Sequence, residues 1–262
     1  MNYFQFIFFI TAFIIPGCNN EETPTDTYTG PEVTADTSCA DWAEFQINDL
    51  LLSNNVWGKG TETNYEQCIY YKSTDGNTEF GWNWDWPANG GVRAYPEIIF
   101  GLKPWSSNST SPLLPAGINS NNITMQYSVS ASAVGQWNLA YDIWLTDTIS
   151  PGPENVMHEI MIWMHKTNSI SPAGTNRGTI TVNGINFDLW VNENHGSGWT
   201  YIAFVSAETM LSQSLSLNAF LNYLTANDYI TSDLFISGIE FGTEIFEGKG
   251  SVKITTYNLL VK

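Results

Sequence analysis

Residues 158–163, with the sequence HEIMIW, decide the fold, because apolar and β-branched residues at these positions favour a strand that a single carboxylate interrupts. Side chains of a strand alternate between its two faces. Glu159 is therefore predicted to share one face with Met161, while Ile160 and Ile162 point to the other. An ionised carboxylate among apolar neighbours costs free energy, so its presence there indicates a functional role.

A second segment of this kind lies far downstream, at residues 241–246 with the sequence FGTEIF. It places Glu244 among apolar and aromatic residues, as the first segment does with Glu159. Two carboxylates in such settings are predicted to form one site.

The rest of the chain shows mostly strand patterns. Short alternations of apolar and polar residues, separated by clusters of Asn, Gly, Ser and Pro, occur at 123–129, 178–182, 187–191, 201–205 and 251–257. One segment differs, because apolar residues follow helical spacing before a stop at Asn227 and Asp228; these are Leu217, Phe220, Leu221 and Leu224. We therefore predict an all-β body of two packed sheets with one α-helix.

The composition narrows the possible partners. With 43% hydrophobic and only 13% charged residues, a chain of 262 residues can bury a large core, and one main domain suffices. The net charge of -17 would repel phosphate backbones and anionic lipid headgroups, so nucleic acid is not an expected partner. The aromatic content of 14% either fills a β core or supplies flat rings that stack on neutral sugars.

The N-terminus is typical of an exported protein. Residues 4–15 form an apolar run too short to span a bilayer as a helix, so residues 1–17 are predicted to be a signal peptide. Residues 15–18 (IPGC) resemble a bacterial lipoprotein signal, in which Cys18 would carry the lipid; plain secretion and a spare thiol at Cys18 are the alternatives. Residues 18–38 are predicted to be a flexible tether and residues 39–262 the folded domain.

The cysteine count agrees with export. If Cys18 carries an anchor, Cys39 and Cys68 remain and can form one disulfide, which requires an oxidising compartment.

The order of several motifs resembles glycoside hydrolase family 12, over nearly all of residues 39–262. The motifs other than the two carboxylate segments are CADW at 39–42, NNVWG at 54–58, QC at 67–68, GWNW at 81–84, AYP at 94–96 and AYDIW at 140–144. The resemblance implies a retaining endo-β-1,4-glucanase or xyloglucanase with a curved jelly roll, whose concave sheet forms an open substrate cleft.

The resemblance also implies roles for individual residues. Glu159 matches the nucleophile, Glu244 the general acid/base, and Asp142 the residue that hydrogen-bonds the nucleophile. Cys39 and Cys68 match the disulfide pair of the family. The positions that match the sugar subsites or the loop called the cord are Trp42, Asn55, Trp57 and Pro172. Ile245 departs from the Pro that follows the acid/base in several members.

The chemistry of these residues agrees with the same roles. A retaining glycosidase needs two carboxyls about 5–5.5 Å apart, one to attack the anomeric carbon and one to protonate the leaving oxygen and then activate water. Glu244 takes the second role if neighbouring negative charge and apolar walls raise its pKa. Asp142 is predicted to orient Glu159 by sharing a proton. No cofactor and no metal ion are implied, because the two carboxylates supply both kinds of catalysis.

Some patterns allow two interpretations. Trp82, Trp84 and Trp86 share one strand face and are either a sugar-stacking stripe, which would make Trp84 a substrate-binding residue, or core. Met161, on the face of Glu159, is also predicted to contact substrate. The acidic neighbours Glu240 and Glu247 resemble Glu244, and only the Gly-Thr-Glu context separates them.

Two further sequence patterns have simpler interpretations. The dipeptide at 158–159 is not the zinc-protease helix motif, because position 162 is Ile. His165 and His195 are interpreted as surface or subsite-rim residues rather than as ligands.

The sequence as a whole predicts an exported endo-β-1,4-glucanase that contacts a membrane only through its lipid anchor. Its partners would be β-1,4-glucans such as cellulose-type chains, xyloglucan and mixed-linkage β-glucan, and a xyloglucan-specific enzyme is the alternative within this class. A non-catalytic glycan-binding lipoprotein and a structural envelope lipoprotein are alternatives from other classes, but neither accounts for the two carboxylates in their motifs.

Overall fold

The computed structural model describes residues 36–74, 77–88, 90–196 and 198–262. The predicted signal peptide (1–17), Cys18 and most of the predicted tether (18–38) lie outside the described residues. The first strand, β1 (Asp36–Ser38), already pairs with β4, so the folded body includes three residues that the sequence assigned to the tether. Among the described residues, no helix is long and apolar enough to cross a membrane.

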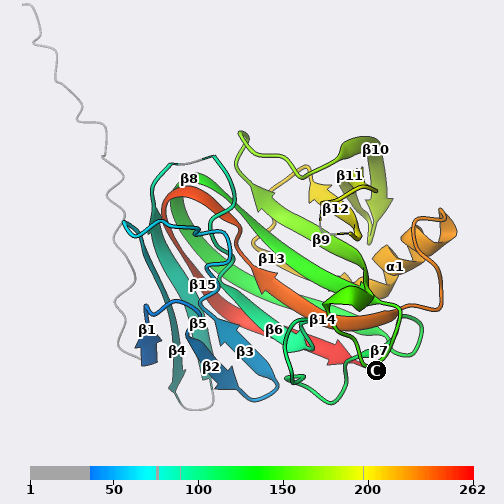
Figure 1. The fold of residues 1–262 in the computed structure, drawn as a ribbon, viewed down its shortest axis with the longest axis horizontal. Helices are drawn as coiled ribbons and strands as arrows, with labels where there is room; N and C mark the ends of the chain where they lie inside the picture. Colours follow the sequence, from blue (N-terminus) through cyan, green and yellow to red (C-terminus); the bar gives the residue numbers. More distant parts are fainter. Residues whose placement is uncertain (1–35, 75–76, 89, 197) are drawn as a thin grey trace, which may run out of the picture.

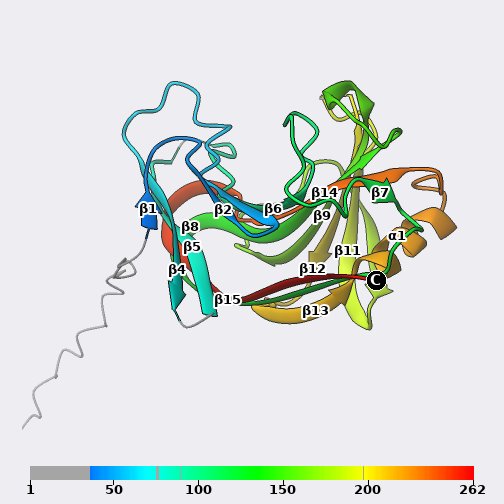
Figure 2. The same ribbon diagram turned by 90° about the horizontal axis from the view of Figure 1, so that it is seen from below.

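The strands form two layers that face one another (Figures 1 and 2). We call the first layer the outer sheet. Its order is β1, β4 (Glu66–Thr74), β5 (Asn77–Trp86), β15 (Ile245–Val261), the first half of β8 (Ile123–Thr146) and β13 (Ser212–Ser216).

The second layer, the cleft sheet, carries the predicted catalytic segments. Its order is β2 (Glu44–Ile47), β3 (Leu50–Ser53), β6 (Glu97–Gly101), β14 (Phe235–Gly242), the second half of β8, β9 (Val156–Lys166), β12 (Thr200–Ser206), β11 (Ile185–Asn192) and β10 (Thr175–Val182). The short strand β7 (Ala116–Gly117) pairs with one end of β14, and a 3-10 turn, η1 (Pro153–Asn155), precedes β9. The pairing of β9 with β12 is parallel, and the other pairings of named strands in the described part of the chain are antiparallel.

Strand β8 belongs to both sheets, which connects the two layers through one continuous segment. Its first half pairs with β15 and its second half with β14 and β9. Near the change of sheet, Gly135 lies opposite Gly248, with φ angles of 100° and 96°. A Cβ on Gly135 would lie 2.5 Å from the Glu247 carbonyl oxygen, so this crossing needs glycine on both strands.

The predicted helix is present as α1 (Leu217–Ala226), and it ends at Asn227 as expected. All four of its apolar positions are buried, and the ring of Phe220 packs 5.0 Å from Phe204 and 5.4 Å from Phe187. Each of the five predicted strand segments lies within a strand of the structure. Together with the open, two-layered arrangement, this confirms the predicted jelly roll with one helix.

The tryptophan stripe of β5 belongs to the core. Trp82, Trp84 and Trp86 are 0%, 1% and 2% exposed, and Trp84 packs 5.8 Å from the ring of Trp137. The prediction that Trp84 binds substrate is therefore wrong, because β5 lies in the outer sheet and turns this face toward the interior. Alternation alone does not say which face of a strand meets the core.

The predicted disulfide between Cys39 and Cys68 is present. It ties the segment after β1 to β4, next to the residues that border one side of the cleft.

Candidate active site

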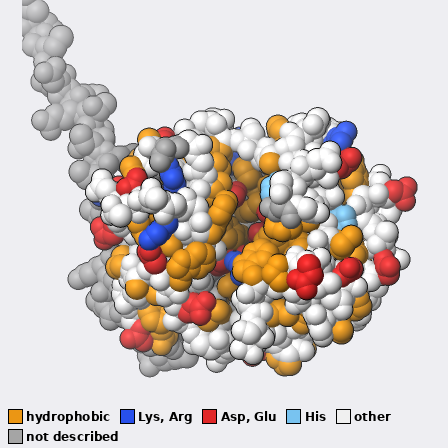
Figure 3. Space-filling model, in the orientation of Figure 1, with side chains coloured by type: hydrophobic (Ala, Val, Ile, Leu, Met, Phe, Trp, Pro, Cys, Tyr) orange, Lys and Arg blue, Asp and Glu red, His pale blue; other side chains and the backbone are white. Residues whose placement is uncertain are grey.

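A cleft of about 600 Å³ lies on the exposed face of the cleft sheet. Figure 3 shows it as a hollow with hydrophobic side chains on both sides and acidic groups inside. Its lining includes all the predicted site residues except Trp84: Trp42, Asn55, Trp57, Asp142, Glu159, Met161, Pro172 and Glu244. Residues of both catalytic segments therefore reach one open groove.

Glu159 lies on the cleft face of β9, as the alternation predicted. Its neighbours Ile160 and Ile162 belong to the main core, and Met161 lines the cleft with Glu159. One carboxylate oxygen, Oε2, accepts a hydrogen bond of 2.7 Å from the indole N–H of Trp199. The low-polarity surroundings raise the pKa of Glu159 to about 7, although the Trp199 hydrogen bond and the charge of Lys103 both act to lower it.

Glu244 lies in the two-residue connection between β14 and β15. The side chain of Asn138, which is fully buried, binds it twice, because Oδ1 accepts from the Glu244 backbone N–H (2.8 Å) and Nδ2 donates to the Glu244 carboxylate. The Asn138 backbone N–H also donates to the Glu244 carbonyl (3.0 Å). These bonds fix both the backbone and the carboxyl of Glu244.

The electrostatics of Glu244 differ from those of an ordinary surface glutamate. Desolvation, followed by the negative charge of Glu159, raises the pKa of Glu244 to about 8, against the opposing effect of the Asn138 hydrogen bond. The ionised form of Glu159 therefore favours the protonated form of Glu244. A nucleophile and a proton donor require these two protonation states.

Ile245, which follows Glu244, makes a backbone hydrogen bond that proline could not make. The backbone N–H of Ile245 donates to the carbonyl of Ala94 (3.0 Å), a bond that the Pro expected from the resemblance would not make. The Ile245 carbonyl in turn accepts from the backbone N–H of Arg93 (2.7 Å). Two backbone hydrogen bonds thus hold this segment in place without proline.

Asp142 lies on the cleft face of β8, directly opposite Met161 in the register with β9. Burial, followed by the charges of Glu159 and Glu240, raises the pKa of Asp142 well above its usual range. Its Oδ1 atom is buried and has no hydrogen-bond partner. A protonated carboxyl beside Glu159 agrees with the predicted orienting role, which remains a prediction.

Two exposed tryptophans border one side of the cleft. Trp42 and Trp57 are 52% and 59% exposed, so their ring faces are open to a ligand. Asn55 connects this side to the sheet, because its Oδ1 accepts from the Trp57 backbone N–H (3.0 Å) and its Nδ2 donates to Glu97 Oε1 (2.7 Å). Trp42 has a φ of 59°, uncommon for a non-glycine residue, and its N–H donates to the Asn54 carbonyl (3.0 Å).

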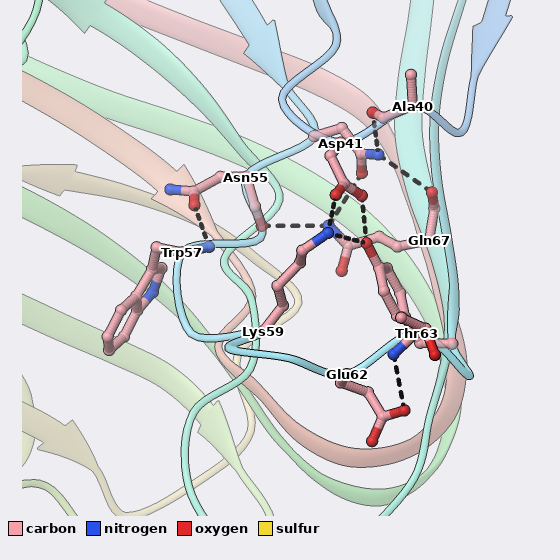
Figure 4. Close-up of polar contacts among 10 residues, drawn as sticks. Ala40, Asp41, Asn55, Trp57, Lys59, Glu62, Thr63 and Gln67 are labelled. Carbon is pink, nitrogen blue, oxygen red and sulfur yellow. Dashed lines mark hydrogen bonds and ion pairs between the residues drawn. The ribbon is translucent and has the colours of Figure 1, made fainter.

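A polar cluster beside these tryptophans braces their segments (Figure 4). Asp41, next to Trp42, accepts from both Lys59 Nζ and the Tyr65 hydroxyl, and the ion pair with Lys59 lowers the pKa of Asp41. The ring of Tyr65 stacks on buried Trp86 at 3.9 Å. The tryptophan stripe of β5 thus supports the cleft wall from behind.

Met161 and Pro172 line the cleft as predicted. The Met161 sulfur accepts from the Trp163 indole N–H and from the Tyr201 hydroxyl, each at 3.3 Å, which holds the thioether still beside Glu159. Pro172 belongs to the segment between β9 and β10.

The structure adds residues that the sequence did not single out. Three further tryptophans line the cleft together: the rings of Trp105 and Trp144 lie 4.7 Å apart, and Trp199 lies 5.5 Å from Trp144 and 6.3 Å from Trp105. Trp144 follows Asp142 by two residues, so the strand period was a usable signal for it. Trp105 and Trp199 lie in loops, where no periodic signal exists.

Glu240, one of the acidic residues that resemble Glu244, also lines the cleft but has a different environment. It is 1% exposed, and it binds Lys103 Nζ (3.1 Å) and the Trp144 indole N–H (2.9 Å). Glu247 lies in β15 and does not line the cleft. In the described ranges, no three His, Cys, Asp or Glu side chains cluster in a way that could hold a metal ion.

Comparison with known proteins agrees with this geometry. The sequence profile of glycosyl hydrolase family 12 matches residues 48–262. The chain belongs to this family. As a member of glycosyl hydrolase family 12, it is a glycoside hydrolase, and its jelly roll is the fold of the family's solved structures.

Relatives of this family 12 chain include bacterial and fungal enzymes. It is 35% identical over 230 residues to endoglucanase S of Pectobacterium parmentieri, covering 85% of this chain and 86% of the relative. It is 31% identical over 230 residues to a probable xyloglucan-specific endo-β-1,4-glucanase A of Aspergillus fumigatus, covering 85% of this chain and 90% of the relative. The structure of the family 12 xyloglucanase from Bacillus licheniformis superposes with a TM-score of 0.80 at 30% identity, covering 87% of this chain and all of the other.

Proposed function

We propose that this family 12 enzyme is an endo-β-1,4-glucanase that hydrolyses internal β-1,4-glucosidic bonds with retention of configuration. The observation that carries the proposal is the pair Glu159 and Glu244 in one open cleft, with the charge of Glu159 raising the pKa of Glu244. A groove open at its surface accepts the middle of a polymer, which an endo-acting enzyme requires. The family relationship and the relatives named endoglucanase support the same activity.

The first step uses the two carboxyls in opposite protonation states. The carboxylate of Glu159 attacks the anomeric carbon and forms a covalent ester, while protonated Glu244 gives its proton to the leaving glycosidic oxygen. The Trp199 indole N–H orients Glu159 for this attack. Asp142, protonated beside Glu159, would donate to it and spread its charge.

The second step reverses these roles. Glu244, now a carboxylate, takes a proton from water, whose oxygen attacks the anomeric carbon and releases Glu159. Asn138 keeps the Glu244 carboxylate at the same place in both steps. Two inversions at one carbon leave the product in the configuration of the substrate.

The sugar chain would lie along the cleft and stack on its exposed aromatic rings. Trp42 and Trp57 line the cleft with exposed rings, and Trp105, also in the lining, is 47% exposed. We propose xyloglucan and unbranched β-1,4-glucans as substrates, since relatives carry both endoglucanase and xyloglucanase names. Strict specificity for xyloglucan is the alternative, favoured by the similarity to the Bacillus licheniformis xyloglucanase.

Export is part of the proposal. The disulfide between Cys39 and Cys68 supports an oxidising location. We further propose that Cys18 carries a lipid that anchors the enzyme to a membrane. Substituting Cys18→Ser should move the enzyme from the membrane fraction to the soluble fraction, and an unchanged membrane fraction would contradict the anchor.

The experiment that tests the activity compares tamarind xyloglucan, barley β-glucan and carboxymethylcellulose under identical conditions, by rate of reducing-end release and by product length. The proposal predicts a rapid fall in polymer length on at least one of them, and its loss in Glu159→Ala. Branched oligosaccharides from xyloglucan, with little hydrolysis of the other two, would establish the xyloglucan-specific alternative. Binding without hydrolysis of any polymer would contradict the enzyme and favour a glycan-binding protein.

A further inference from the structure

A buried cation lies under the cleft, in a chain with few cations. Lys103 is 8% exposed, and its ammonium donates to Glu97 Oε1 (2.7 Å) and to Glu240 Oε2 (3.1 Å). Both of these carboxylates are 1% exposed. Burial disfavours the ammonium, but the attraction of Glu240 and Glu97 outweighs this effect and raises the pKa of Lys103.

The backbone before Lys103 positions its side chain between Glu97 and Glu240. At the end of β6, Gly101 has a φ of 93°, and a Cβ at this position would lie 2.7 Å from the Leu114 side chain. Both backbone polar groups of Leu102 bind Ser237 of β14. The Leu102 N–H donates to the Ser237 carbonyl (2.8 Å), and the Leu102 carbonyl accepts from the Ser237 hydroxyl (2.6 Å). The turn after β6 is thus pinned to β14, and Lys103 follows it directly.

Each of the two carboxylates that bind Lys103 also accepts a hydrogen bond from a residue that lines the cleft. Glu97 accepts from the side-chain amide of Asn55, which in turn caps the backbone N–H of Trp57. Glu240 accepts from the indole N–H of Trp144, whose ring packs against Trp105 and Trp199. Both branches therefore end at residues that line the cleft.

We propose that Lys103 is a positioning residue of the hydrolytic site, whose ammonium fixes two buried carboxylates and, through them, the cleft-lining side chains of Asn55 and Trp144. This inference rests on the proposed function, because it concerns the same site. The Trp144 branch ends at Trp199, which donates to Glu159, so the network also bears on the orientation of the nucleophile.

The charge of Lys103 has a second consequence. The titratable groups that face this network or Glu159 are Tyr95, Glu97 from β6, Asp142 from β8, Glu159 from β9, Tyr201 from β12, Glu240 from β14 and Glu244. Among these groups Lys103 is the cation, and it lowers the pKa of both Glu159 and Asp142. Removing its charge should therefore make Glu159 harder to ionise.

The test measures kcat/KM against pH, on the β-glucan that the wild-type enzyme hydrolyses fastest, for Lys103→Met and Lys103→Arg. The acid limb reports ionisation of the nucleophile in the free enzyme. In Lys103→Met it should move to higher pH by roughly half to one unit. Lys103→Arg keeps the charge and should bring the limb back toward the wild-type position. Lys253→Met, which removes an exposed ion pair with Glu79 on the outer sheet, is the matched control and should leave the profile unchanged.

Lys103→Met leaves two buried carboxylates without their cation, which threatens folding. The same substitution is therefore also made in Glu97→Gln, where only one of them remains charged and the amide oxygen still accepts from Asn55. The acid limb of the double variant should lie at higher pH than that of Glu97→Gln alone.

A folded Lys103→Met variant with the wild-type acid limb would overturn the inference while leaving the proposed function intact. A wild-type enzyme that hydrolyses no β-glucan would overturn both.

Discussion

The two faces of the central strands of the cleft sheet differ sharply although their residues alternate along the same strands. On β8 and β9, Ile143 and Ile160 are 0% exposed in the core, and their neighbours Asp142 and Glu159 line the cleft. The core face is apolar and gains free energy from burial, whereas the cleft face keeps carboxylates in surroundings that disfavour their charge. The core face therefore stabilises the fold, whereas the cleft face carries the reactive carboxylates at a cost in stability.

The largest effect is expected on the cleft face. Glu159→Ala should abolish hydrolysis, and Glu244→Gln should lower kcat by roughly 10²–10⁴-fold on unactivated polymers, because it removes general acid/base catalysis. Rates are measured by reducing-end release, with melting curves to show that each variant folds. Glu79→Ala, in an exposed ion pair of the outer sheet, is the control and should keep full activity. Wild-type rates in Glu159→Ala would remove the assignment of the nucleophile.

The core face should respond in the opposite way. Ile162→Ala, three residues from Glu159 but buried in the main core, should lower the free energy of unfolding by about 2–5 kcal/mol. The rate per folded molecule should stay near the wild-type value at temperatures where the variant is folded. Denaturant unfolding and kcat on the same preparation check both statements. If kcat falls tenfold without loss of stability, the separation of the two faces is wrong.

The free energy of unfolding should depend on pH because Glu244, in the cleft, is desolvated. Glu244 has a pKa of about 8 in the folded protein and an ordinary value of 4.5, so between these values the folded state holds a proton that the unfolded state releases. Its contribution to stability is greatest below about pH 4.5 and falls as the pH rises toward 8.

Glu244→Gln does not titrate, so at pH 8 it should be more stable than the wild-type protein by roughly 4 kcal/mol, or on the order of 10 °C in melting temperature, and the difference should shrink to about 1 kcal/mol at pH 5. Melting temperatures of both proteins at pH 5, 6, 7 and 8 test this. A constant difference across the range would show that Glu244 is not desolvated.

The smallest effect concerns two tryptophans. Trp57→Ala removes an exposed ring from the cleft and should raise KM by about tenfold, since roughly 50 Å² of lost apolar contact with the sugar corresponds to about 1 kcal/mol of binding free energy. The free energy of unfolding should change little, because the ring is exposed. Trp84→Phe should leave KM unchanged and lower the melting temperature, because Trp84 is buried between the sheets. The reverse pattern would restore Trp84 as a sugar platform and remove Trp57.

The sequence was informative where a local period carries the information. The two-residue alternation placed Glu159 and Met161 on one face of their strand, which lines the cleft, and the helical spacing predicted α1; Asp142 came from the family resemblance. The same alternation did not place Trp84, because the direction of the core depends on which sheet a strand joins. Lys103 was also missed, since its partner Glu240 lies 137 positions away and only the folded sheet brings the two together. Trp199 lies in a loop and acquires its role only from the position of Glu159.

Azide rescue distinguishes the nucleophile from the acid/base, because the two carboxyls act on opposite faces of the sugar ring. With a β-cellobioside that carries an activated aryl leaving group, Glu244→Ala still forms the glycosyl ester with Glu159 but lacks the base that activates water. Azide needs no base, so it should restore turnover of Glu244→Ala and give the β-glycosyl azide. In Glu159→Ala, azide can displace the aryl group only from the opposite face and should give the α-glycosyl azide. The β-azide from Glu159→Ala, with the α-azide from Glu244→Ala, would contradict the assigned roles.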